Sequence, residues 1–162
     1  MTVVKRSVAA LKNKKVGRLG GASLLVLVAL VGAFEGYREK AYRDSIGVPT
    51  ICYGYTDGVQ MGDRKNKAEC DALLVEELEE ANGHVNRCIA APLTDNQRTA
   101  LVSLAYNAGP KAVCGSTLQR RFNAGQYELG CKEILKWKYA GGKVIPGLER
   151  RRREESELCL AP

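Results

Sequence analysis

The sequence predicts one α+β domain in which a small β-hairpin region precedes about five helices. The chain has 162 residues, which suits a single domain with a core of its own. Glycine and proline alternate with β-branched and aromatic residues between residues 44 and 58, a pattern typical of short strands and turns. From residue 66 onward, helix-capping pairs are followed by apolar residues at helical spacing. No internal repeat or low-complexity linker divides the chain.

The N-terminal segment looks built for a membrane. Residues 1–18 carry six basic residues and no acidic one, and residues 19–34 are uncharged and apolar. As a helix, this apolar run spans roughly 24 Å, at about 1.5 Å per residue. That is shorter than the hydrocarbon core of about 30 Å, and small residues dilute the run. The preceding cations predict a cytoplasmic N-terminus and a translocated body.

Three interpretations of residues 19–34 stay open. The run is a signal peptide that is cut before Phe34, because Val31 and Ala33 are small enough to precede a cleavage site. Alternatively, it is a permanent anchor, or a weak anchor that can leave the bilayer. A buried helix of an ordinary soluble protein explains the apolar run but not the cationic flank.

The positive charge belongs to this flank. The formal net charge is +7, but the other 19 of the 25 basic residues nearly balance the 18 acidic ones. No nucleic-acid-binding motif accompanies the cations, so we expect no nucleic-acid partner. The six cysteines are even in number, and the export-like N-terminus favours disulfides over reduced thiols.

The body is mostly helical in pattern. Residues Tyr37 to Tyr42 are amphipathic, which predicts that the helix continues after Glu35. Residues Thr50 to Tyr55 predict a strand, and Asp57-Gly58 predict the turn after it. Three capping pairs predict helix starts at Asn66 with Glu69, Thr94 with Gln97, and Ser116 with Gln119. Further helices are expected over Tyr127 to Trp137 and Leu148 to Leu160, and breaks at Gly109-Pro110, Asn123 to Gly125, and Gly141-Gly142.

Two charged clusters and the lone histidine are interpreted as surface features. The acids Glu76, Glu77, Glu79 and Glu80 predict a solvated helix face and only weakly suggest a metal site. Arg150 to Arg153, followed by acidic residues, predict a salt-bridged helix surface. His84 is expected at the surface or at its boundary.

Two carboxylates and a hydroxyl lie where helix is expected to pass into hairpin: Glu35, Asp44 and Thr50. Glycoside hydrolysis needs one protonated acid and a second, ionised carboxylate or a positioned water. Glu35 follows an apolar run, which favours a protonated carboxyl, while Asp44 lies among polar residues. Thr50 is able to hold a water by hydrogen bond. Taken alone, this spacing is too common to assign an activity.

The order of motifs carries more weight. Eight residues separate Glu35 from Asp44 and five separate Asp44 from Thr50, which resembles the catalytic signature of the phage-type lysozymes, glycoside hydrolase family 24. Further stretches between residues 34 and 160 also resemble that family. They are Thr50-Ile-Cys-Tyr-Gly-Tyr, Pro92 to Gln97 with Ala100 to Gly109, Ser116 to Leu118, Asn123 to Gly125, and Trp137 to Lys143 with Pro146 to Leu148 and Arg151-Arg152.

The resemblance implies a mainly helical lysozyme fold with a small N-terminal β-hairpin region. It implies hydrolysis of the β-1,4 bond between N-acetylmuramic acid and N-acetylglucosamine in peptidoglycan, without a metal or organic cofactor. Glu35 is then the general acid, and Asp44 and Thr50 position the attacking water, with inversion. A nucleophilic Asp44, with retention, is the alternative. Tyr55 departs from the family, in which a histidine is common at this position.

The N-terminal segment resembles the signal-anchor helix of signal-anchor-release endolysins. This implies a flank and anchor over residues 1–34 and a muramidase domain over residues 35–162. The implied enzyme is a monomer that is tethered in the bacterial inner membrane through residues 19–34 and is then released into the periplasm. For the cysteines we favour pairs between neighbouring elements, Cys52–Cys70, Cys88–Cys114 and Cys131–Cys159.

Other functions compete with this interpretation. A muramidase with a cleaved signal peptide shares the same chemistry but loses the anchor. A non-catalytic peptidoglycan-binding module explains the body, although the intact Glu35, Asp44 and Thr50 argue against it. Membrane disruption by the N-terminus is the least favoured, because the segment has no cationic helical face.

Overall fold

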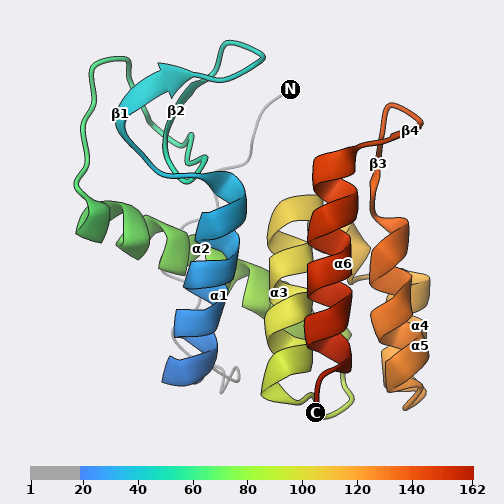
Figure 1. The fold of residues 1–162 in the computed structure, drawn as a ribbon. Helices are drawn as coiled ribbons and strands as arrows, with labels where there is room; N and C mark the ends of the chain where they lie inside the picture. Colours follow the sequence, from blue (N-terminus) through green and yellow to red (C-terminus); the bar gives the residue numbers. More distant parts are fainter. Residues whose placement is uncertain (1–18) are drawn as a thin grey trace.

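The computed structural model describes residues 19–162, so the predictions about the cationic flank, residues 1–18, lie outside the described part. The described chain begins with an apolar helix, α1 (Gly21–Glu35), which packs mainly on α3 (Asp95–Ala108). Helix α3 lies between α1 and the last helix, α6 (Pro146–Leu160), as Figure 1 shows. No helix of the described part reaches the length and apolarity that crossing a membrane requires.

Helix α1 buries one face only. Leu27 and Val31 are fully buried, whereas Leu25 and Val26 are 74% and 49% exposed. The helix ends at Glu35 because Gly36 takes a φ of 73°, a conformation that glycine adopts without steric penalty. The backbone N–H of Gly36 donates to the carbonyl of Gly32 and so closes the last turn.

The predicted continuation of this helix over residues 37 to 42 is wrong. Those residues form most of strand β1 (Arg38–Arg43), which pairs antiparallel with β2 (Pro49–Cys52). The register places Tyr42 opposite Thr50, with an irregularity between Arg38 and Tyr42. An amphipathic pattern is ambiguous here, because the glycine stop and a partner strand outweigh local propensity. The predicted strand at residue 50 is confirmed but ends at Cys52, after which the chain turns back.

The predicted helix starts are confirmed by their caps. Asn66 and Glu69 form a reciprocal capping box at the start of α2 (Lys67–Cys88), and Thr94 and Gln97 do the same for α3. The Ser116 side chain accepts a hydrogen bond at the start of α4 (Thr117–Asn123). The buried stripe of α2 follows the predicted spacing and includes Leu74, Leu78, Ala81 and Val85. Helix α3 is central, because all its residues from 99 to 105 are buried.

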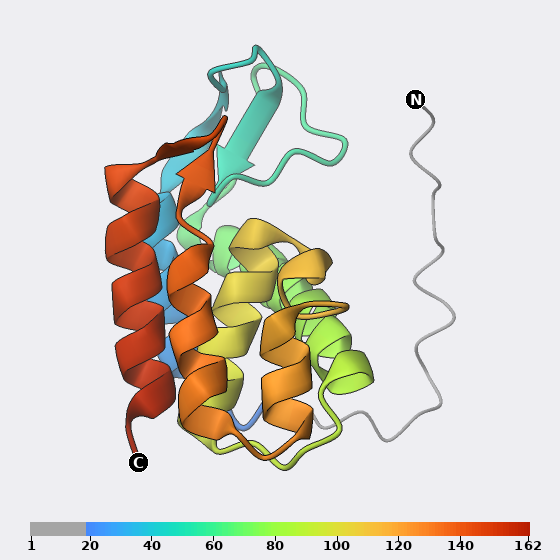
Figure 2. The same ribbon diagram turned by 90° about the vertical axis from the view of Figure 1, so that its right-hand side faces the viewer.

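The C-terminal half closes the core around α3 and α6 (Figure 2). The expected helix over Tyr127 to Trp137 is an α-helix, α5 (Tyr127–Glu133), that tightens into a 3-10 turn, η3 (Ile134–Lys136). The break at Gly141-Gly142 is the turn of a short hairpin, β3 (Tyr139–Ala140) and β4 (Lys143–Val144). A second 3-10 turn, η2 (Pro110–Ala112), follows the predicted end of α3.

All three predicted disulfides are confirmed. Cys52–Cys70 joins β2 to α2, Cys88–Cys114 joins the end of α2 to the segment before α4, and Cys131–Cys159 joins α5 to α6. Each bridge closes a loop of moderate length and so removes conformational freedom from the unfolded chain. The first bridge fixes the base of the β1–β2 hairpin to the helix beneath it.

Candidate active site

Glu35 is the last residue of α1 and lies where this helix meets the β1–β2 hairpin (Figure 1). Its side chain is 24% exposed, and Oε1 accepts a hydrogen bond of 2.6 Å from Nη1 of Arg151 on α6. The guanidinium of Arg151 also stacks over the ring of Phe34, with Cζ 4.7 Å from the ring centroid. The carboxylate is therefore held from the helix side and remains open on the other.

Arg151 is held in turn by a buried carboxylate. Its Nε donates to Glu155 Oε1 at 3.0 Å, and the hydroxyl of Ser103 on α3 donates to the same oxygen at 2.6 Å. Arg152 donates to the other oxygen of Glu155 and to the side-chain oxygen of Asn107. Two guanidiniums thus face two carboxylates, and all four groups form one network.

The prediction that Arg150 to Arg153 form a helix surface is wrong for its two central members. The side chains of Arg151 and Arg152 are 4% and 1% exposed, and Glu155 is fully buried. The sequence held a signal for this arrangement. Residues 152, 155, 156 and 159 share one helical face, and a disulfide cysteine at position 159 marks that face as the core side.

Asp44 directly follows β1 in the hairpin loop. Its Oδ1 accepts hydrogen bonds from the backbone N–H groups of Ile46 and Val48, at 3.0 and 2.8 Å. This is a typical turn made by an aspartate side chain. The backbone of Asp44 also donates to the carbonyl of Val48. One carboxylate oxygen is therefore committed to the loop, and Oδ2 is the oxygen that remains for other partners.

Thr50 lies on β2 and is 3% exposed. Its hydroxyl donates to the carbonyl of Val48 at 2.9 Å, so its remaining lone pairs are acceptors. Val48 therefore holds both Asp44 and Thr50 through its two backbone groups. The structure brings these two residues together on one hairpin, next to the end of α1. Glu35, at the end of that helix, makes its ion pair with Arg151 on α6.

A second acid, Glu77 on α2, lies near Glu35. It belongs to the acidic cluster predicted to be solvated, but its side chain is half-buried, so that prediction is wrong for this residue. Burial raises the pKa of Glu77 to about 7, and the charge of Glu35 contributes in the same direction. The hydroxyl of Tyr106 on α3 lies 3.5 Å from Glu77 Oε2. Burial also raises the pKa of Tyr106 far above its ordinary value.

Tyr55, which stands where a histidine is common in the family, is half-buried and lies near Glu77. Burial raises the pKa of its phenol, and Asp57 and Glu77 add to the effect. His84 lies at the boundary, as predicted, and its half-buried ring contacts Arg87. Burial lowers the pKa of His84.

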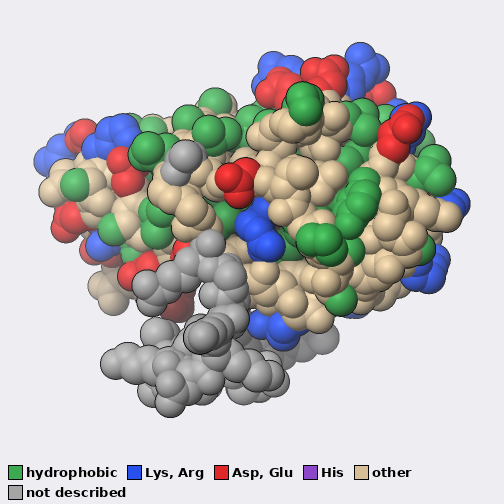
Figure 3. Space-filling view, turned by 90° about the horizontal axis from the view of Figure 1, so that it is seen from below, with side chains coloured by type: hydrophobic (Ala, Val, Ile, Leu, Met, Phe, Trp, Pro, Cys, Tyr) green, Lys and Arg blue, Asp and Glu red, His purple; other side chains and the backbone are tan. Residues whose placement is uncertain are grey.

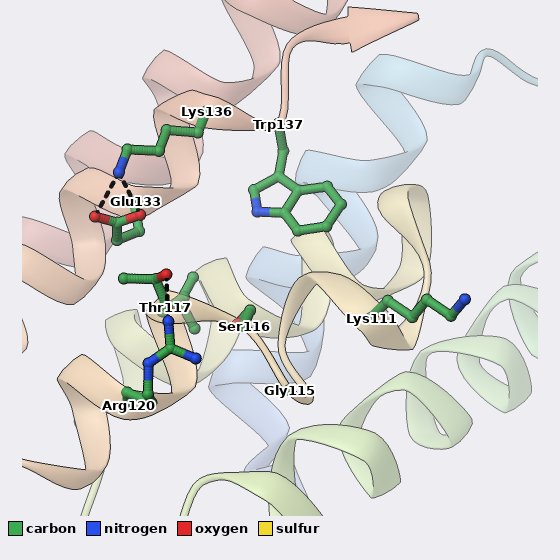
Figure 4. Close-up of a pocket in the computed structure, with 9 residues that line it drawn as sticks. Lys111, Gly115, Ser116, Thr117, Arg120, Glu133, Lys136 and Trp137 are labelled. Carbon is green, nitrogen blue, oxygen red and sulfur yellow. Dashed lines mark hydrogen bonds and ion pairs between the residues drawn. The ribbon is translucent and has the colours of Figure 1, made fainter.

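An open cleft of about 500 Å³ lies in the C-terminal half (Figure 4). The indole of Trp137 forms one side, and the hydroxyl of Thr117, which accepts a hydrogen bond from Arg120, lies on the other. The carbonyl of Trp137 accepts a hydrogen bond of 3.0 Å from Arg152 Nε, which connects the cleft wall to the buried arginine network. The cleft is lined by Lys111, Gly115, Ser116, Thr117, Leu118, Arg120, Glu133, Lys136 and Trp137.

Comparison with known proteins places this geometry in a family. The family described as phage lysozyme matches residues 32–155. The SAR-endolysin of Pseudomonas phage phiKMV is 40% identical over 149 residues, covering 89% of this chain and 92% of the relative. The SAR-endolysin of Enterobacteria phage P21 is 37% identical over 147 residues, covering 87% and 89%.

A solved structure agrees with these relatives. The muramidase domain of SpmX from Asticaccaulis excentricus superimposes with a TM-score of 0.78 at 34% identity, covering 90% of this chain and 99% of that domain. The mixed helical fold with its two-stranded hairpin is thus a lysozyme fold. The chain belongs to the phage lysozyme family, and it is a phage endolysin of the signal-anchor-release type with the activity of a glycoside hydrolase.

Proposed function

We propose that Glu35, Asp44 and Thr50 carry the hydrolysis of the β-1,4 bond between N-acetylmuramic acid and N-acetylglucosamine in peptidoglycan. The strongest support is the hydrogen bond that holds the Glu35 side chain in place. Arg151 fixes Oε1, which leaves Oε2 to deliver a proton to the leaving oxygen. The Asp44 and Thr50 pair lies across the junction of helix and hairpin, where a second group is required.

The arginine network explains how Glu35 can be protonated beside a cation. An ion pair by itself favours the ionised carboxylate and so opposes a general acid. Arg151 also pairs with Glu155, which is fully buried. This second ion pair persists whether or not Glu35 is protonated. Protonating Glu35 therefore does not leave a buried guanidinium without a carboxylate, which is the costly outcome.

The hairpin supplies the attacking water. The water donates one hydrogen to Asp44 and one to the acceptor lone pairs of Thr50, and its own lone pair faces the anomeric carbon. In the reaction the water oxygen bonds to that carbon, the glycosidic bond breaks, and Glu35 protonates the departing oxygen. Asp44 takes the proton lost by the water, and exchange with solvent restores both acids. This route inverts the anomeric configuration, and a nucleophilic Asp44 would retain it.

The test replaces Glu35 with glutamine in the secreted, oxidised protein and follows the turbidity of purified peptidoglycan. Loss of the general acid lowers the rate by about 100-fold or more. Glu39→Gln is the matched control, because Glu39 is an exposed carboxylate on the adjoining strand and keeps full activity. Wild-type rates in Glu35→Gln would refute catalysis by Glu35 and favour the alternative, a non-catalytic peptidoglycan-binding module. The first anomer released, read by NMR, distinguishes inversion from retention.

We also propose that residues 19–34 hold the enzyme inactive in the bacterial inner membrane, with the N-terminus in the cytoplasm. Release then lets the segment pack as α1, and the enzyme acts in the periplasm as a monomer. In this view residues 1–34 are the flank and anchor, and residues 35–162 are the muramidase domain. Tethering draws Glu35 to the bilayer surface, because it directly follows the apolar run.

Fractionation of expressing cells tests the anchor. Membrane-bound protein that becomes active on release, with residues 19–34 still attached, supports the proposal. A mature N-terminus at Phe34 would instead identify a cleaved signal peptide. Equal activity in the membrane-embedded and released forms would contradict the inactive tether. The mass of the released form, measured by analytical ultracentrifugation, tests whether it is a monomer.

A further inference from the structure

The hydroxyl of Tyr106 lies between two acceptors beneath the hairpin. Its oxygen is 3.3 Å from the backbone carbonyl of Tyr53 and 3.5 Å from Oε2 of Glu77. A phenol has one hydrogen, so it can donate to only one of these partners at a time. If Glu77 is ionised, both partners are acceptors and only one of them receives this hydrogen.

A proton on Glu77 removes this conflict. The carboxylic acid donates to the oxygen of Tyr106, and Tyr106 donates to the carbonyl of Tyr53, so that every group in the chain is satisfied. Burial raises the pKa of Glu77 to about 7 even though the hydrogen bond from Tyr106 lowers it, so the protonated acid is populated up to neutral pH. The charged and titratable groups that face Glu77 and Tyr106 are Glu35 from α1, Tyr55 from the segment after β2, Arg151 from α6, and Glu80 on the same helix as Glu77.

The receiving end of this chain is close to the proposed water site. Tyr53 directly follows β2 and is three residues after Thr50. Its side chain is already tied to α2, because its hydroxyl donates to Asp71 at 2.7 Å. The neighbouring Cys52 is bonded to Cys70 on the same helix. The bond from Tyr106 ties this end of the hairpin to α3 as well, the helix that also carries Ser103 of the arginine network.

We propose that Glu77 is a positioning residue whose protonated carboxyl completes a hydrogen-bond chain through Tyr106 to the Tyr53 carbonyl and thereby holds Thr50 in register with Glu35. The proposal rests on the role of Thr50 in positioning the water. Glu77 itself touches no substrate in this scheme. It acts through Tyr106 and the hairpin backbone.

The chain makes the hairpin sensitive to pH with a defined sign. Below pH 7, protonated Glu77 donates and the hairpin is held. Above pH 7, the carboxylate competes with Tyr53 for the single hydrogen of Tyr106, and the hairpin loosens. Glutamine at position 77 reproduces the donor of the protonated acid at every pH. The variant therefore keeps the chain intact where the wild type loses it.

The test compares Glu77→Gln with wild type in the peptidoglycan turbidity assay between pH 6 and pH 9. The ratio of variant to wild-type rate rises by about threefold or more across this range, the effect of one neutral hydrogen bond. Glu76→Gln makes the same charge change one residue earlier at an exposed position, and its ratio stays flat. A flat ratio for Glu77→Gln, or an equal rise for Glu76→Gln, would overturn the proposal.

Two further measurements separate positioning from a general loss of fold. Tyr106→Phe removes the relay, so adding Glu77→Gln to it produces no pH-dependent gain. Ile51 and Tyr55 bond to each other across the turn, and the protection factors of their amides, which are corrected for base-catalysed intrinsic exchange, fall above pH 7 in wild type but not in Glu77→Gln. A gain that persists in the Tyr106→Phe background, or wild-type protection factors that do not change with pH, would refute the hydrogen-bond chain. The Glu35→Gln result bears only on catalysis, so the two proposals fail separately.

Discussion

Replacing Glu155 with glutamine tests the arginine network most directly. Glu155 is fully buried and accepts hydrogen bonds from Arg151, Arg152 and Ser103. Without its charge, two buried guanidiniums share one carboxylate, Glu35, which is itself partly exposed. Removing one partner of a buried ion pair costs about 3–5 kcal/mol, because an uncompensated charge stays in the core. For a chain of this size, this is a drop in Tm of about 6–20 °C.

The same change lowers activity for a reason other than stability. In Glu155→Gln, Arg151 loses the carboxylate that holds it in place, so it no longer fixes Glu35 in the orientation that delivers the proton. We expect the rate at neutral pH to fall by about tenfold or more at temperatures where the variant is fully folded.

Circular dichroism on oxidised protein measures the stability, and the turbidity assay measures the rate. Glu154→Gln is the matched control, since it removes an exposed partner that lies 4.0 Å from Arg150. Exposed pairs of this kind contribute about 0–1 kcal/mol. If Glu155→Gln and Glu154→Gln unfold within about 1 kcal/mol of each other, the network does not hold Arg151 as argued.

Three other outcomes follow from the structure. The stability of the folded state decreases as the pH rises from about 5 through 7, because the folded-state pKa of Glu77 lies above its ordinary value, and chemical denaturation of Glu77→Gln lacks that decrease. Gly130→Ala destabilises by about 1–3 kcal/mol, since a Cβ there would lie 2.6 Å from the ring of Phe122; an unchanged unfolding midpoint would show that the ring moves freely. Trp137→Ala raises the KM for polymeric peptidoglycan by about tenfold and leaves kcat nearly unchanged if the cleft binds glycan; an unchanged KM would exclude the cleft from substrate binding.

Local signals in the sequence predicted most of the fold. The Asn66 and Thr94 caps lie within three residues of their partners, so local chemistry alone determines where those helices begin. The stretch after Gly36 was mispredicted because its structure depends on a partner strand around Thr50. Its amphipathic pattern is compatible with helix until that pairing is known.

The candidate site was likewise predicted only in part. Glu35, Asp44 and Thr50 were proposed because their spacing resembles the family signature, and the structure places them on consecutive elements, α1, the loop after β1, and β2. Arg151 was placed on the surface because an arginine run is usually solvated, and its burial depends on a carboxylate that is contributed by the same helix and on Ser103 from α3. Glu77 was assigned to a solvated face for the same reason. Burial of charge is a tertiary property, and only the register of each helix against the core decides it.

The outer face of α1 carries apolar side chains that the folded enzyme does not need for packing. This supports the proposed membrane-bound form. A helix on the surface of a soluble domain requires one apolar face, yet α1 exposes Leu25 and Val26 as well, and apolar side chains also reach the surface seen from below (Figure 3). Replacing Leu25 and Val26 together with glutamine therefore leaves the fold and the activity of released protein near wild type, while the protein shifts from the membrane to the soluble fraction. Leu129→Gln removes an apolar side chain from α5 that is about as exposed as Val26, and it leaves this distribution unchanged. Continued membrane retention of the double variant would show that the outer face of α1 does not contact lipid.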